Sequence, residues 1–127
     1  MAGSALDQAT LDLLDQRREI DMLTPRRDGS TSSRPIWIVV VDGQAYVRSY
    51  RGPSGAWYRR ALADGRAAIG VDGQTIDVAA EPEHDAVLNG RISDAFVAKY
   101  GERSPGPTEA MVSPEIVGTT LRLTSAS

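Results

Sequence analysis

The sequence has no cysteine, and this absence excludes disulfides, thiol nucleophiles and cysteine-ligated metals. It has a single histidine, His84, so one chain cannot build a metal site from several histidines. No apolar run approaches the roughly 20 residues of a membrane-spanning helix. The acidic N-terminus lacks the basic and apolar segments of a signal peptide. We therefore expect a cytoplasmic protein with no metal and no membrane partner.

Lysine is also scarce. Lys99 stands against thirteen arginines, and the formal net charge is −3. A negative net charge does not favour nucleic acid as a partner, because both molecules then carry the same sign of charge. Arginine presents a planar fork suited to phosphate and carboxylate. A GC-rich genome explains the arginine bias by itself, so the functional argument depends on where the arginines lie.

Length and patterning predict an α+β fold that is mainly β. The 127 residues are expected to form one domain, 1–127, with an N-terminal helix within 1–18. Six short antiparallel strands and three flanking helices indicate a small barrel decorated by helices. We expect strands at 19–24, 36–41, 44–50, 67–71, 74–80 and 119–124, and helices at 4–17, 55–64 and 83–100.

Residues 36–50 are expected to form a hairpin with an Asp-Gly turn. The first strand, 36–41, is apolar on both faces, which predicts a central strand covered on both sides. On the return strand Tyr46, Arg48 and Tyr50 share one face. An arginine between two tyrosines is unusual for a core, and it indicates a surface, a groove or a dimer contact.

Capping and turn signals set the other bounds. Ser4 and Ser54 are candidate caps for the first two helices, and Pro82 can open the long helix. Residues 25–35 and 104–114 contain prolines and are expected to be loops. The first of these loops carries three arginines. It is either a solvated hairpin loop or a basic rim that faces a ligand phosphate.

A loop containing glycine and proline, 51–55, precedes the second helix and is a plausible anion cradle. Trp57 and Tyr58 could wall an aromatic ring, but ordinary core packing explains Trp57 more simply. Arg59 and Arg60 could reach the same anion or could lie on a solvated helix face.

One acidic cluster surrounds the histidine, with Glu81, Glu83 and Asp85 beside His84. A histidine between acids can act as a general base. Acidic residues at a helix start are more simply partners of the helix dipole. No catalytic side chain is assigned from the sequence.

The stretch 24–62 resembles the split β-barrel of the pyridoxamine-phosphate-oxidase-like flavoproteins, and within them the deazaflavin-dependent nitroreductase-like proteins. Nearly the whole chain resembles a family of small bacterial proteins, the domain of unknown function 2255. The motifs that carry this second resemblance are Arg27-Asp28-Gly29, Pro35-Ile36-Trp37, Tyr46 to Gly52, Gly55 to Arg59, Lys99-Tyr100-Gly101 and Thr120 to Leu123.

The resemblance implies a split-barrel homodimer that binds FMN or a deazaflavin coenzyme and acts as an oxidoreductase on a small organic molecule. In the deazaflavin-type proteins the loop before the first long strand usually reads Gly-Arg-Lys-Ser-Gly, and Asp28 departs from that pattern. The alternative is a cofactor-free dimer that binds an anionic small molecule or catalyses a non-redox biosynthetic step. The implied cofactor-binding residues are Arg27, Arg34, Arg48, Ser49, Arg51, Gly52, Gly55, Trp57, Tyr58 and Arg59.

Overall fold

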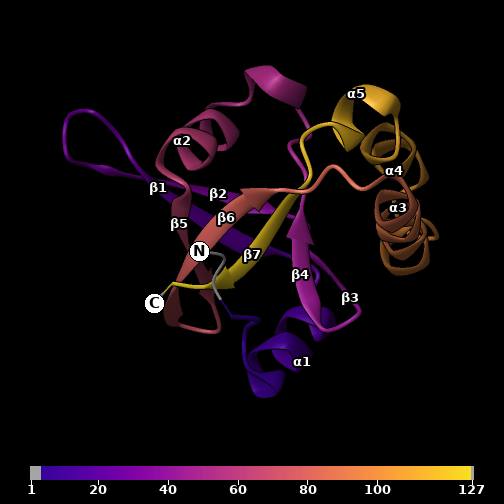
Figure 1. Cartoon of the computed structure of the whole chain (residues 1–127), viewed down its shortest axis with the longest axis horizontal. Helices are drawn as coiled ribbons and strands as arrows, with labels where there is room; N and C mark the ends of the chain where they lie inside the picture. The colour runs from indigo at the N-terminus through magenta and orange to yellow at the C-terminus, as the bar shows by residue number, and fades with distance from the viewer. Residues whose placement is uncertain (1–3, 127) are drawn as a thin grey trace.

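The computed structural model describes residues 4–126, which form a curled, antiparallel seven-stranded sheet with helices around it (Figure 1). The strand order is β2-β1-β5-β6-β7-β4-β3. The strands are β1 (Ile20–Pro25), β2 (Thr31–Ile36), β3 (Val39–Val41), β4 (Gln44–Val47), β5 (Arg66–Val71), β6 (Gln74–Pro82) and β7 (Leu121–Ser125). The helices are α1 (Gln8–Gln16), η1 (Gly52–Ser54), α2 (Ala56–Asp64), α3 (Ala86–Tyr100), α4 (Pro105–Met111) and α5 (Pro114–Val117).

The predicted α+β split-barrel fold is confirmed, with a seventh strand that the sequence pattern hid. Residues 25–35 are not one loop, because β2 pairs with β1 from Ile20 opposite Ile36 to Pro25 opposite Thr31. The chain turns at residues 26–30, where Gly29 has a φ of +89°. Pro35 lacks an N–H, and a sheet tolerates it because β2 is an edge strand.

The expected central strand 36–41 is shorter and lies at the opposite edge of the sheet, as β3. The expectation that it is central was wrong, and its apolar pattern has another cause. Both α1 and α3 contact β3, and Ile38 and Val39 belong to two different hydrophobic clusters. Helices on the two sides therefore cover this edge strand, burying Val39 fully and Val40 and Val41 partly.

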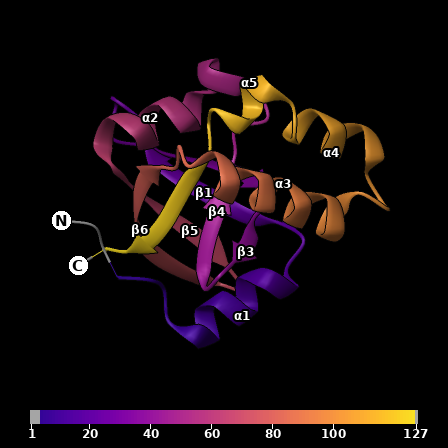
Figure 2. The same cartoon turned by 45° about the vertical axis from the view of Figure 1, so that its right-hand side comes forward.

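Residues 104–114, expected to be a loop, contain α4 and the start of α5. Both helices begin with a proline, at Pro105 and Pro114, where the missing N–H has no helical partner to lose. Read locally, these prolines predict a loop, whereas in the structure they mark helix starts. Figure 2 shows α3 and α4 together on one side of the molecule, with α5 above them.

Three predicted helix starts are also corrected. Asp7, not Ser4, caps α1 by accepting a hydrogen bond from Thr10 N. The long helix begins after Asp85, whose side chain accepts from Leu88 N, because residues up to Pro82 continue β6. The side chain of Ser54 does not cap α2.

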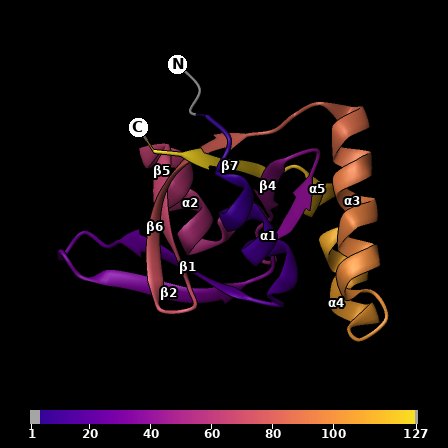
Figure 3. The same cartoon turned by 90° about the horizontal axis from the view of Figure 1, so that it is seen from below.

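The sheet separates two hydrophobic clusters. The larger one fills the barrel, and the smaller one lies between the sheet and α3, α4 and α5. Figure 3 shows α3 and α4 on one side of the molecule and the β1–β2 hairpin reaching out on the other. Tyr46 and Arg48 are 2% and 1% exposed in this arrangement, so of the surface, groove or dimer contact expected for this face, the surface position is wrong for these two side chains. Tyr50, on the same predicted face, is 59% exposed.

The C-terminal end of α3 joins the start of β3 to α1 through two polar side chains. The Tyr100 hydroxyl accepts a hydrogen bond from Ile38 N at 3.0 Å and donates to Arg18 O at 2.8 Å. Lys99 Nζ donates to Leu14 O at 3.0 Å and to Ile38 O at 2.8 Å. Burial lowers the pKa of Lys99 to about 8 and raises the pKa of Tyr100 to about 12.

We expect Lys99 to make the protein more stable as the pH rises from 8 towards 10. The folded state releases the Lys99 proton near pH 8, while the unfolded chain keeps it to about 10.5. The unfolded state then binds more protons, so the free energy of unfolding increases with pH. Above pH 10 Tyr100 acts in the opposite direction, because the unfolded chain loses the tyrosine proton first.

Thermal unfolding at a series of pH values between 7 and 10 measures this slope. Lys99→Met removes the titrating group, and Lys99→Arg keeps a charge throughout the range, so both variants should lack the slope. An equal slope in wild type and in both variants would show that Lys99 does not cause it.

Candidate functional site

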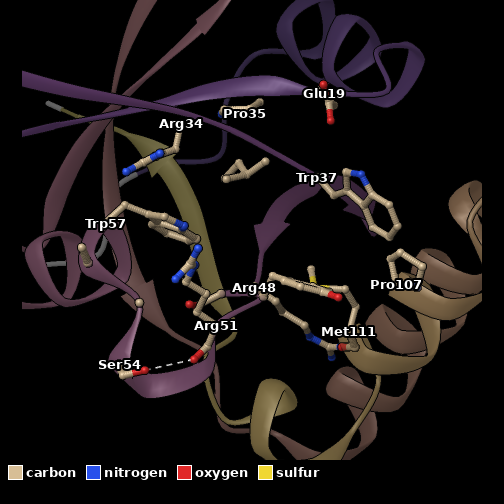
Figure 4. Close-up of a pocket in the computed structure, with 15 residues that line it drawn as sticks. Glu19, Arg34, Pro35, Trp37, Arg48, Arg51, Ser54, Trp57, Pro107 and Met111 are labelled. Atoms are coloured by element: carbon tan, nitrogen blue, oxygen red, sulfur yellow. Dashed lines mark hydrogen bonds between the residues drawn. The ribbon is translucent and has the colours of Figure 1, made fainter.

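A cavity of about 660 Å³ opens where the end of β2, the connection from β4 to α2, and α4 come together (Figure 4). Its volume is within the range of small-molecule sites. The lining combines aromatic, apolar and basic side chains with one carboxylate. The lining residues are Glu19, Arg34, Pro35, Ile36, Trp37, Arg48, Ser49, Tyr50, Arg51, Ser54, Gly55, Ala56, Trp57, Pro107 and Met111.

Several predicted site residues meet in this cavity, and the others lie elsewhere. The cavity brings together Arg34, Arg48, Ser49, Arg51, Gly55 and Trp57. Arg27, Gly52, Tyr58 and Arg59 are outside its lining. Arg27 is exposed in the β1–β2 turn and Arg59 is exposed on α2, while Tyr58 is 8% exposed in the barrel core.

The loop from Ser49 to Gly55 is held by its own hydrogen bonds. Ser49 Oγ donates to Gly52 O at 2.8 Å, and Ser49 N donates to Thr119 Oγ1 at 2.9 Å. Gly52 has a φ of +74°, and its carbonyl also accepts from Gly55 N. Gly55 has no room for a side chain, because a Cβ there would lie 2.3 Å from Ser49 Oγ. Gly52 thus contributes by shaping the loop from which the cavity wall is built.

We expect Gly55→Ala to destabilise the protein by about 1–3 kcal/mol, since overpacking forces the loop to shift. Ser49→Ala should cost about 1 kcal/mol for the lost hydrogen bond. In the double variant the clashing hydroxyl is gone, so the two costs should fall short of additivity. Urea unfolding of the four proteins measures this coupling.

Gly90→Ala is the matched control, because nothing lies within 4 Å of a Cβ at that helical position. It should be neutral or stabilising by up to about 1 kcal/mol. Additive costs for Ser49→Ala and Gly55→Ala would contradict the close contact as the source of the strain.

Positive charge is concentrated on the α2 side of the cavity. No side chain caps α2 at Gly55, and Ala56, its first residue, lines the cavity. The first N–H groups of a helix have no partner within the helix and attract anions. Arg34 and Arg51 are exposed, and their guanidinium groups form no hydrogen bond or ion pair within residues 4–126. This part of the cavity can therefore receive an anionic group.

Arg48 lines the same cavity but has no free donor for a ligand. Its Nε donates to Thr120 Oγ1, its Nη1 donates to Ser93 Oγ and Met111 O, and its Nη2 donates to Asn89 O and Oδ1. These distances run from 2.8 to 3.2 Å. Burial lowers the Arg48 pKa to about 10, so the group stays charged at neutral pH. Arg48 thus ties the end of β4 to α3 and α4.

Tryptophans stand on both sides of the cavity. In Figure 4 Trp57 lies on the same side as Arg34 and Arg51, and Trp37 lies opposite, with Pro107 beside it. Trp37 stacks on Tyr100 with ring centroids 4.0 Å apart and ring planes 1° from parallel. The cavity therefore has a basic side and an apolar aromatic side.

Sequence reasoning did not assign Trp37, Pro107, Met111 or Glu19 to the site. They come from elements far apart in the chain, and only the fold brings them together. The one available signal was that Trp37 lies within a motif shared with the resembling family. His84 is exposed and lies outside the cavity lining.

Two features are absent from the part of the chain that the structure describes. Within residues 4–126 no group of three or more histidine, aspartate or glutamate side chains is arranged to hold a metal ion. In the same part of the chain no helix is long and apolar enough to cross a membrane.

The chain belongs to the family described as "Uncharacterized protein conserved in bacteria (DUF2255)", whose pattern matches residues 10–123. This membership agrees with the motifs singled out in the sequence. No curated protein matches the chain in sequence.

Solved structures with a similar fold are pyridoxamine-phosphate-oxidase-like split barrels. The heme storage protein HutZ from Vibrio cholerae is 14% identical with a TM-score of 0.67, covering 97% of this chain and 92% of its own. An F420-H2-dependent reductase (FDR-A) is 14% identical with a TM-score of 0.61, covering 84% and 93%. A candidate pyridoxamine 5′-phosphate oxidase from Listeria innocua is 18% identical with a TM-score of 0.57, covering 91% and 87%. At sequence identities this low, the structural similarity establishes the fold alone.

Proposed function

We propose that this protein binds a phosphate-bearing aromatic cofactor, FMN or a deazaflavin coenzyme, and acts as an oxidoreductase on a small organic molecule. The observation that carries the proposal is the placement of Arg34 and Arg51 beside the uncapped start of α2 in a cavity with tryptophans on two sides. Within residues 4–126 their guanidinium groups have no hydrogen-bond or ion-pair partner. Two of the structurally similar proteins are named as an oxidase and a reductase.

The residues that line the cavity fit a phosphate-bearing aromatic cofactor. A phosphate needs convergent N–H donors and positive charge, which Arg34, Arg51 and the first turn of α2 supply. A planar ring system needs flat apolar walls, which Trp37, Trp57 and Pro107 supply. The cavity volume of about 660 Å³ leaves room for an aromatic ring and its phosphate-bearing chain.

A bound flavin or deazaflavin would supply hydride transfer, so this chain needs no cysteine or histidine for the redox step. The chain's own part is binding and orientation. Arg51 and Arg34 would hold the anionic group at the α2 side. Trp37, fixed by its stack on Tyr100, would limit the positions open to a ring or substrate at the other side.

We further propose that residues 1–127 act as one domain that pairs as a homodimer. Tyr50, at the rim of the cavity, is 59% exposed, and aromatic side chains are enriched at protein–protein interfaces. A second chain placed over this rim would bury Tyr50 and narrow the opening. Sedimentation should then give twice the 13.6 kDa chain mass, and a single-chain mass at micromolar concentration would refute this pairing.

Titration of the protein with FMN, and separately with the deazaflavin coenzyme, tests the cofactor proposal. Fluorescence should show saturable binding of one of them, and the free energy of unfolding should rise by about 2.7 kcal/mol at a hundredfold excess over Kd. Arg34→Gln and Arg51→Gln should each weaken binding about tenfold, because each removes a charge-assisted contact to the phosphate.

Arg66→Gln is the matched control, since Arg66 is also exposed but lies outside the cavity lining. It should bind the cofactor as the wild type does. Absence of binding by either cofactor would reject the redox proposal and favour the cofactor-free alternative. Equal losses in all three arginine variants would instead indicate non-specific attraction to the anion.

A further inference from the structure

Arg48 is a buried cation whose contacts are all neutral. Its five hydrogen bonds end on hydroxyl, amide and backbone carbonyl oxygens, and its guanidinium carbon lies 5.2 Å from the centroid of the Phe96 ring. The ion pairs found within residues 4–126 involve Arg17, Arg91 and Arg122. Burial lowers the Arg48 pKa, and no carboxylate in residues 4–126 forms an ion pair with this group. Neutral dipoles therefore solvate this charge without cancelling it.

An uncancelled charge in the interior is costly, and a counter-charge nearby lowers that cost. Arg48 is 1% exposed, so bulk solvent does not approach its side chain. It nevertheless lines the cavity, where Figure 4 places it next to Met111. The cavity is thus the space beside Arg48 in which a negative charge can be placed.

We propose that Arg48 sets the charge selectivity of the cavity without touching the ligand, and that a bound anion is its missing counter-ion. This inference rests on the proposed function in so far as it takes the ligand to carry a phosphate. Arg34 and Arg51 are exposed, so salt and water weaken their fields. The field of Arg48 passes through protein of lower dielectric constant and is screened less.

The competing explanation is purely architectural, because the same five hydrogen bonds hold α3 and α4 against the sheet. One measured quantity distinguishes the architectural role from the electrostatic role: the ratio of the Kd for riboflavin to the Kd for FMN. Riboflavin lacks the phosphate of FMN but keeps its ring. If Arg48 only holds the fold together, its replacement weakens the binding of both ligands. If its charge acts on the ligand, loss of the charge weakens the binding of FMN alone.

Arg48→Lys keeps the positive charge and Arg48→Met removes it at similar length. We expect the selectivity ratio to fall at least about tenfold in Arg48→Met and to stay near the wild-type value in Arg48→Lys, with riboflavin binding alike in both. Ser93→Ala, which removes one hydrogen-bond partner and leaves the charge, should keep the ratio. A wild-type ratio in Arg48→Met, or an equal fall in Arg48→Lys, would overturn the proposal.

A second variant covers the case in which Arg48→Met does not fold. In the double variant Arg34→Gln, Arg51→Gln both exposed cavity charges are gone, and a residual preference for FMN of about threefold or more should remain. No residual preference would overturn the role of Arg48.

Inorganic pyrophosphate, followed by thermal shift, separates this inference from the proposed function. If neither flavin binds the wild type but pyrophosphate does, and Arg48→Lys keeps that shift while Arg48→Met loses it, the cofactor proposal fails and the role of Arg48 stands. If pyrophosphate also gives no shift, the role of Arg48 fails too.

Discussion

The packing of helices α3 and α4 on the sheet depends on the hydrogen bonds of the Arg48 guanidinium. This guanidinium projects from just beyond β4 into the space under α3 and donates to α3, to the last residue of α4 and to Thr120 just before β7. Most of these acceptors are buried, and a buried polar atom left without a partner costs about 1–3 kcal/mol. One side chain thus pairs with several polar groups and holds α3 together with α4, which lines one side of the cavity.

The opposite wall is fixed by a tight loop that one side-chain hydroxyl closes. Ser49 and Gly52 close a tight loop, and Gly55 lets the chain pass close to the Ser49 hydroxyl as it enters α2. The loop leaves the start of α2 without a side-chain cap, so its N–H groups are available at the cavity. A structural constraint on two glycines therefore has a chemical consequence, since the N–H groups at a helix start attract negative charge.

Fold class and much of the order of elements could be predicted from this sequence. The hairpin turns at Asp42-Gly43 and Asp72-Gly73 adopt the positive φ values that their chemistry indicated, and α2 ends at Gly65 as predicted. β2 and α4 were missed because proline and polar residues indicate a loop when read locally. Residues 31–36 form a strand because they pair with β1. α4 packs against α3, and its residues Thr108 and Met111 are buried.

The sequence by itself determined which chemical groups are available: thirteen arginines against one lysine, two tryptophans, a glycine-containing loop before a helix, and no thiol. It did not determine which arginine faces a ligand. Arg48 and Arg51 are three residues apart, yet one is buried with every donor used and the other is exposed with none. That difference was decided only by tertiary structure, because α3 and α4, from the C-terminal half of the chain, cover the first and leave the second open.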